Sequence, residues 1–280
     1  MSVIITGDST IDLSPQLLEQ YGVQTVPLYV NMGGKSYRDG VDMQPADIYA
    51  YVEKTGELPK TSAPSVQDYI DFFERLRKEY DEVVHFNLSS ELSVSHQNAR
   101  LAAEEMDGVY VIDSRNLSTG TGLLVLEACD RAKAGMDAVN ICREIGELIP
   151  KVEASFILNR LDYLAKGGRC SSLLALGANV LKLRPVIMVQ DGKMDVGKKY
   201  RGAYDKCVEK YLDGQLAGRT DIRKNRIFVT HTKCRPETIA EAKAMVAKLQ
   251  NFDEVLDTTA GGTITNHCGE ETLGVLFIRE

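Results

Sequence analysis

The stretch EVVHFNLSSELSVSHQNARLAAEEMDGVYVID, residues 82–113, contains the pattern from which the fold class follows. It begins with the β-rich run EVVHFNL, continues through the helical pattern SHQNARLAAEEM, and ends with a second β-rich run, VYVID. A strand, a helix and a strand in this order predict a parallel sheet, because parallel neighbours need a long crossover between them.

The same alternation extends over the first half of the chain. The runs VIIT (residues 3–6) and TVPLYV (25–30) are β-rich, and SPQLLEQYG, PADIYAYVEKTG and VQDYIDFFERLRKEY have helical patterns. Two more helices are expected near residues 122–133 and 137–149, before Pro150. We therefore predict an N-terminal α/β domain, residues 1–152, whose parallel sheet has helices on both faces and whose ligand binds at the carboxyl ends of the strands.

The second half has a different pattern. The segment RPVIMVQDGKMDVGKKYRG contains two β-rich runs around the turn signal Asp191-Gly192, which predicts a hairpin. The further runs ASFIL, RIFVTH and LGVLFI are expected to be strands, and PETIAEAKAMVAKLQ a helix. These elements predict a C-terminal α+β domain with a mixed sheet, residues 153–280.

Composition and motifs exclude several classes of function. Hydrophobic residues make up 44% and charged residues 26%, as in ordinary globular proteins, and the net charge of −7 argues against nucleic-acid binding. No long apolar run or export signal is present, so we expect a cytoplasmic protein that does not span a membrane. The six cysteines and four histidines lack metal-ligand spacing, and no nucleotide-binding glycine motif is present, so neither a metal nor a cofactor is expected.

Hydroxyl-rich segments follow the predicted strands at four places: GDST, KTSAPS, LSSELSVSH and IDSRNLSTGTG. Each serine or threonine taken alone is most simply a helix cap, but together they indicate one polar pocket at the carboxyl ends of the strands. Helix N-termini there would favour an anionic ligand. The hydroxyls expected in this pocket are those of Ser9, Thr61, Ser62, Ser65, Ser93 and Ser118.

Seven motifs in order, TGDSTIDL, VPLYV, PKTSAPS, LSSELS, VIDSRNLSTGTG, LDYLAKGGR and NHCGEETLG, resemble the DegV family of bacterial fatty-acid-binding proteins. The resemblance covers nearly the whole chain. It implies two α/β domains that hold a long-chain fatty acid between them. It also implies a carrier rather than an enzyme: the lipid-binding subunit of a fatty acid kinase. A separate ATP-binding kinase subunit would phosphorylate the carboxylate, and the acyl phosphate would enter phospholipid synthesis.

The resemblance also implies roles for individual residues. Thr61, Ser62, Ser93 and His267 fall on positions that bind the carboxylate, and Val94 lies beside them. Arg169 matches an arginine implicated in phosphate transfer or in contact with the kinase subunit, and Arg201 also lies at a family-like position. Neutral hydroxyl donors would hold a carboxylate less tightly than a bidentate arginine, which suits a carboxylate that must react.

The chain departs from the family pattern at two places. Val94 replaces a glycine, so the backbone there cannot easily take a positive φ. Glu270 and Glu271 replace a proline and a glycine, and acidic side chains near a carboxylate are unfavourable unless they point away. The walls of the acyl pocket are expected in SSLLALGANVLKL (residues 171–183) and VIMV (186–189).

Two other functions remain open at this point. The first is a hydrolase with Ser93 or Thr61 as nucleophile and His96 or His267 as base. The second is a binding module for a small phosphorylated or carboxylated metabolite, which would need a polar pocket but no long apolar one.

Overall fold

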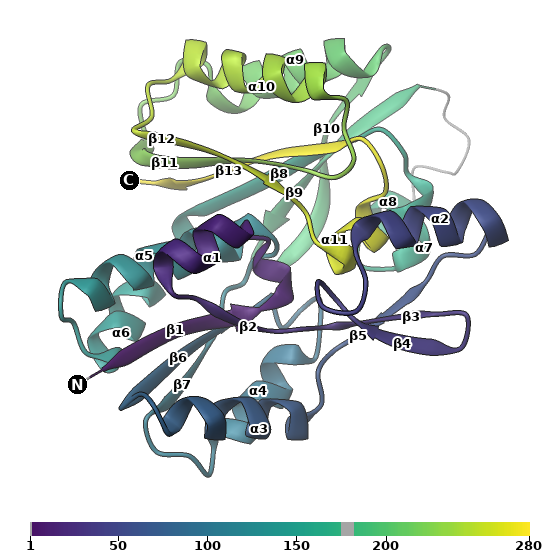
Figure 1. Cartoon of the computed structure of the whole chain (residues 1–280). Coiled ribbons are helices and arrows are strands. Elements are labelled where there is room, and N and C mark those ends of the chain that lie inside the picture. The colour runs from purple at the N-terminus through teal and green to yellow at the C-terminus, as the bar shows by residue number, and fades with distance from the viewer. Residues whose placement is uncertain (1, 175–181) are drawn as a thin grey trace.

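The computed structural model describes residues 2–174 and 182–280 and arranges them in layers around two large sheets (Figure 1). Helices cover the outer side of a six-stranded sheet, further helices lie between this sheet and a four-stranded one, and others cover the far side of the four-stranded sheet. This is the mixed α/β architecture that the sequence predicts.

The four-stranded sheet has the order β2-β1-β6-β7, and every neighbouring pair is parallel. Helices α3 and α4 pack on one face and α5 and α6 on the other, so the prediction of helices on both faces is confirmed. The elements are β1 (Val3–Asp8), α1 (Pro15–Tyr21), β2 (Gln24–Val26), α3 (Val66–Arg77), β6 (Glu82–Asn87), α4 (Ser95–Ala103), β7 (Val109–Asp113), α5 (Thr119–Lys133) and α6 (Ala138–Leu148).

The six-stranded sheet has the order β10-β9-β8-β13-β11-β12 and is mixed, as predicted, because β11 and β12 are parallel and the other pairs antiparallel. The β9–β10 hairpin turns at Asp191 and Gly192, whose φ angles are 49° and 80°, as the Asp-Gly signal predicts. The elements are β8 (Val152–Leu158), β9 (Leu183–Gln190), β10 (Lys193–Arg201), α9 (Tyr204–Leu216), β11 (Ile222–His231), α10 (Pro236–Leu249), β12 (Glu254–Thr259) and β13 (Thr272–Arg279).

Helix α5 lies between the two large sheets and contacts strands of both. Its residues 119–129 are all buried, as expected for a helix that is covered on every side. A Cβ atom at Gly122 would lie 2.8 Å from the carbonyl oxygen of Ile11, so this glycine allows close packing. The two halves of the chain therefore share one apolar core, and the boundary between residues 152 and 153 stays a prediction.

A third, antiparallel sheet of order β4-β3-β5 was not expected. The prediction of a single strand over TVPLYV was wrong, because the chain leaves the first sheet after β2 and begins β3 after a gap of two residues. Pro27 lies in this gap and has no N–H for a strand ladder. The elements are β3 (Tyr29–Met32), β4 (Lys35–Arg38), α2 (Pro45–Thr55) and β5 (Lys60–Ser62).

The short helix α11 joins distant parts of the chain. It contacts α2, β3 and β5 of the first half and α7 of the second. Within the described part of the chain, no helix is both long and apolar enough to cross a membrane. The remaining elements are η1 (Ser9–Ile11), η2 (Ile149–Lys151), α7 (Asp162–Gly167), α8 (Ser171–Leu174) and α11 (Gly262–Cys268).

Candidate functional site

A cavity of about 460 Å³ lies where β5, the loop after β6, α7 and α11 meet. Its volume is in the range of about 300–1,000 Å³ that is usual for small-molecule sites. Both halves of the chain build it, and hydroxyl groups lie among apolar side chains. The leucine and isoleucine side chains of its wall are Leu28, Leu88, Leu92, Leu117, Leu164 and Ile264.

Thr61 and His267 meet in the wall of this cavity. Thr61 lies on β5 opposite Val30 of β3, and its Oγ1 is 2.8 Å from Nε2 of His267 on α11. Burial, assisted by the charge of Arg169, lowers the pKa of His267 to about 4. The imidazole is therefore neutral at pH ~7, and the pair is an uncharged hydrogen-bonding unit.

The two glycines of the KGGR segment have different roles. A Cβ atom at Gly167 would lie 2.4 Å from Nδ1 of His267, so only glycine lets the end of α7 pack on the imidazole. Gly168 has a φ of 70° and turns the chain. Arg169 follows, lines the cavity, and donates from Nη1 to the carbonyl oxygen of Gly167 at 2.7 Å.

Ser93 and Val94 line the cavity at the start of α4. The Oγ of Ser93 is 2.8 Å from Oγ of Ser95 and accepts a hydrogen bond from the backbone N–H of Ser95 at 3.2 Å. Val94 has a φ of −80° and is 57% exposed, so it lies at the open side of the cavity with an unstrained backbone. Ser62 also lines the cavity, next to Thr61.

The two acidic residues of the altered NHCGEETLG motif do not line the cavity. Glu270 forms an ion pair with Lys233 at 2.9 Å, and Glu271 accepts a hydrogen bond from Asn159 and lies 3.8 Å from Arg235. Their charges are thus paired with cations elsewhere, which removes the conflict that the sequence suggested.

A buried carboxylate that the sequence reasoning missed fixes the helix that carries His267. Asp39 accepts hydrogen bonds from the backbone N–H groups of Gly262 and Thr263, both at 2.8 Å. Asp12 accepts another from the N–H of Gly261 at 2.8 Å. These N–H groups at the start of α11 already have side-chain carboxyl groups as partners, so this helix end is not the anion site.

Three of the six hydroxyls expected in the pocket do not line it. Ser9 donates to Asp39 at 3.4 Å, Ser118 donates to Asp12 at 2.5 Å, and Ser65 caps α3. The expectation was wrong for these serines because internal carboxylates and a helix end use their hydroxyls. Thr61, Ser62 and Ser93 do line the cavity.

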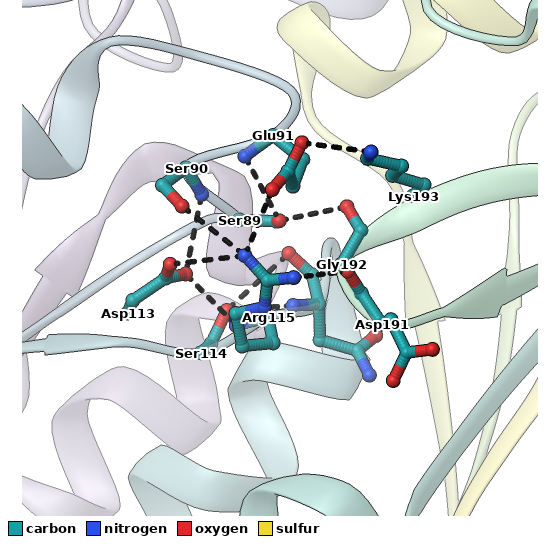
Figure 2. A network of polar contacts seen from close by, with 10 residues as sticks. Ser89, Ser90, Glu91, Asp113, Ser114, Arg115, Asp191, Gly192 and Lys193 are labelled. Carbon is teal, nitrogen blue, oxygen red and sulfur yellow. Dashed lines mark hydrogen bonds and ion pairs between the residues drawn. The ribbon is translucent and has the colours of Figure 1, made fainter.

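Figure 2 shows the polar network that joins the loops after β6 and β7 to the β9–β10 hairpin. The guanidinium of Arg115 contacts the carbonyl oxygen of Asp191 and lies 3.3 Å from Oε1 of Glu91. Ser89 donates to the carbonyl oxygen of Gly192 at 2.7 Å. The network holds the hairpin, and with it Met194 of the cavity wall, against the loop that carries Ser93.

The apolar wall differs from the expected one. The run VIMV lies in β9 and does not line the cavity; Val186 and Ile187 are core residues on opposite faces of the sheet. Of SSLLALGANVLKL, residues 175–181 lie outside the described residues. A small inner pocket of about 30 Å³, lined by Phe156 and Leu276, shares Leu117, Ile264 and Cys268 with the cavity.

Arg201 lies apart from the other predicted site residues. It is the last residue of β10, pairs with Leu183 of β9, is exposed, and does not line the cavity.

The structure also bears on the hydrolase hypothesis. Thr61 and His267 have the spacing of a nucleophile and a base, but Nδ1 of His267 has no partner among the described residues. Ser93 is bonded to Ser95, and no hydrogen bond to His96 is present in that part of the chain. Without a group that orients the imidazole, the arrangement favours binding over nucleophilic catalysis.

A larger depression of about 770 Å³ lies between η2 and strands β8 and β9. Arg219 there is bonded to both Glu153 and Asp221, at 2.5 Å and 2.7 Å. Arg279 there is also paired with Glu153, at 3.1 Å. Because these arginines already have carboxylate partners and none of the predicted carboxylate-binding residues lines the depression, the smaller cavity is the better candidate site.

Comparison with known proteins agrees with this geometry. Residues 2–280 match the family described as "Uncharacterised protein, DegV family". A DegV domain-containing protein of Clostridium acetobutylicum is 36% identical over 278 residues, which cover 99% of this chain and 98% of that protein. One from Caldanaerobacter subterraneus subsp. tengcongensis is 31% identical over 277 residues, 98% of each chain.

Two solved structures show the same fold over nearly the full length of both chains. A DegV lipid-binding protein of Thermotoga maritima matches with a TM-score of 0.88 at 28% identity. The match covers 100% of this chain and 99% of that protein. A DegV family protein of Thermus thermophilus, which binds fatty acid, has a TM-score of 0.88 at 29% identity, with 100% of both chains covered. This chain belongs to the DegV family.

Proposed function

We propose that this protein binds a long-chain fatty acid, with its carboxylate against Thr61, Ser62, Ser93 and His267. The observation that carries the proposal is the neutral Thr61–His267 pair in the wall of a cavity rich in leucine. Uncharged donors suit a carboxylate, and apolar walls suit an acyl chain. The fatty-acid-binding relative from Thermus thermophilus supports the same ligand class.

The acyl chain would extend from the head-group residues toward Phe156 and Leu276. This direction is supported by Leu117, Ile264 and Cys268, which line both the cavity and the small inner pocket. Burial of one methylene contributes about 0.8 kcal/mol, so fourteen would contribute on the order of 11 kcal/mol before the costs of association. Most of the affinity would therefore come from the chain, and a small polar metabolite would not use these walls.

The protein would present the bound carboxylate to a separate ATP-binding kinase subunit, which would form the acyl phosphate, and would have no catalytic residue of its own. Arg169 supports this part of the proposal, because it lines both the cavity and an adjoining outer depression of about 640 Å³. There its guanidinium could meet phosphate oxygens. The exposed Val94 lies at the open side, and Arg201 would contact the partner.

Calorimetric titration of palmitate into Thr61→Val and Ser93→Ala variants tests the carboxylate site. A hydrogen bond to a charged group contributes about 1.5–3 kcal/mol, so each variant should bind palmitate at least about tenfold more weakly than wild type. Thr55→Val is the matched control, because Thr55 is exposed and does not line the cavity. Its hydroxyl bonds locally, to the carbonyl oxygen of Tyr51 in its own helix and to the N–H of Glu57 just after that helix. Unchanged palmitate affinity in both site variants would refute the proposed carboxylate position.

The hydrolase hypothesis makes a different prediction. A hydrolase would release nitrophenol from p-nitrophenyl palmitate without any partner, and Thr61→Val or Ser93→Ala would abolish the release. We expect no turnover beyond the rate in buffer.

A further inference from the structure

Thr263 is a cavity residue to which the head-group assignment gives no role. It is 4% exposed, it lines the cavity, and its Oγ1 has no hydrogen-bond partner among the described residues. Its backbone N–H does have one, the carboxylate of Asp39. A hydroxyl that is shielded from water and left without a partner destabilises the folded protein, so its retention calls for an explanation.

Two neighbours on α11 also carry buried polar atoms without a partner among the described residues, Oδ1 of Asn266 and Nδ1 of His267. Nδ1 of His267 faces Gly167, where not even a methyl group would fit. Asn266 donates to the carbonyl oxygen of Pro59 at 3.0 Å and does not line the cavity. Of these three atoms, the hydroxyl of Thr263 is therefore the one whose missing partner a ligand could supply.

The position of Thr263 on the helix supports this. It precedes His267 by four residues, so the two side chains lie on the same face of α11. A threonine in a helix populates two χ1 rotamers, so its hydroxyl can take either of two positions. Its hydroxyl can thus turn toward a ligand oxygen beside His267 without a shift of the helix.

We propose that Thr263 is a further head-group residue, whose hydroxyl donates to an oxygen of a bound carboxylate. This inference rests on the proposed function, because it takes the head group to lie against Thr61 and His267. Hydrogen bonds to an ionised acceptor are roughly twice as strong as those to a neutral one. Thr263 would therefore make the cavity select ionised fatty acids over fatty alcohols of the same chain length.

Three variants and two ligands test the inference. Wild type, Thr263→Val, Thr263→Ser and Thr265→Val are titrated with palmitate and with 1-hexadecanol, and the thermal unfolding of each ligand-free protein is measured. Valine has nearly the shape of threonine, and serine retains the hydroxyl. Thr265 is the matched control, because it lies on the same helix, donates to the carbonyl oxygen of Ala260 at 3.3 Å, and does not line the cavity.

Thr263→Val should weaken palmitate binding about tenfold and 1-hexadecanol binding less than about threefold, and Thr263→Ser should restore the wild-type ratio of the two affinities. The unfolding midpoint of the ligand-free Thr263→Val variant should rise by about 2 °C, because the unpaired hydroxyl is gone. Thr265→Val should lower that midpoint and leave the ratio of affinities unchanged.

The outcomes separate this inference from the function on which it rests. If wild type binds palmitate and Thr263→Val binds it equally well, or loses affinity for both ligands alike, the role of Thr263 is refuted and the proposed function stands. A lower unfolding midpoint for Thr263→Val would also refute it, since the hydroxyl would then have a partner in the free protein. If wild type binds no palmitate, the proposed function and the role of Thr263 are both refuted.

Discussion

Replacement of Asp12 by asparagine should remove a pH dependence of stability between pH ~6.5 and pH ~8. The carboxyl group of Asp12 lies between Oγ of Ser118 and the N–H of Gly261. Its pKa is raised to about 8, chiefly by burial, to which the charges of Asp39 and Asp8 add. Asparagine can accept from the N–H and donate to the serine, and it tolerates the φ of 50° at this position.

The sign follows from the two pKa values of this carboxyl group. In the unfolded chain Asp12 ionises near pH 3.8, whereas the folded protein holds the proton up to a pH of about 8. The free energy of unfolding therefore falls as the pH rises, by at most about 1.4 kcal/mol per pH unit, or about 2 kcal/mol across the chosen window. The lowered pKa values of His85, about 3, and His267, about 4, act in the opposite direction up to about pH 7.5, because the unfolded chain still takes up part of their protons near pH 6.5. Burial also raises the pKa of Asp8, which acts in the same direction as Asp12. These groups are present in both wild type and Asp12→Asn, so the difference between the two slopes measures Asp12.

Urea unfolding at several pH values within this window measures the effect. The wild-type protein should lose up to about 2 kcal/mol more stability toward the alkaline end than Asp12→Asn does. Asp42→Asn is the matched control, because Asp42 is exposed and hydrogen bonds from Arg38 lower its pKa to about 2, so it is ionised throughout in both states. Equal slopes for wild type and Asp12→Asn would show that the Asp12 carboxyl is already ionised in the folded protein, and would refute this reasoning.

Two further substitutions test how the cavity is held together. Gly167→Ala places a methyl group within 2.4 Å of Nδ1 of His267, so calorimetry should show palmitate binding about tenfold weaker than in wild type. Wild-type affinity of this variant for palmitate would mean that the imidazole does not contact the head group. Arg115→Ala removes the contacts that hold the β9–β10 hairpin at the cavity wall, so palmitate should dissociate about threefold faster or more in stopped-flow fluorescence. The control Arg143→Ala, at an exposed arginine, should not change the dissociation rate. Equal dissociation rates in the two variants would contradict a role for the hairpin in retaining the ligand.

Much of the fold could be predicted because the signals are local. Strand and helix periodicities give the parallel sheet, and the Asp191-Gly192 pair gives the hairpin. The TVPLYV run misled because its composition is β-rich on both sides of Pro27, and composition alone does not show that the two parts join different sheets.

The candidate site was only partly predictable. Thr61, Ser62, Ser93, Arg169 and His267 were found through motifs, and all of them line one cavity. The N-terminus of α11 is held by a carboxylate more than two hundred residues earlier in the chain, Asp39, so no local capping signal precedes that helix. The unpaired hydroxyl of Thr263 could not be predicted from the sequence either, because only the packed structure shows which polar groups lack partners.

The most direct test of fatty-acid binding is native mass spectrometry of the purified protein, followed by denaturation and organic extraction of whatever is released. We predict a long-chain fatty acid bound in a ratio near one to one, or its uptake when palmitate or oleate is added to the empty protein. A protein that carries no lipid and takes up neither fatty acid would contradict the proposed function.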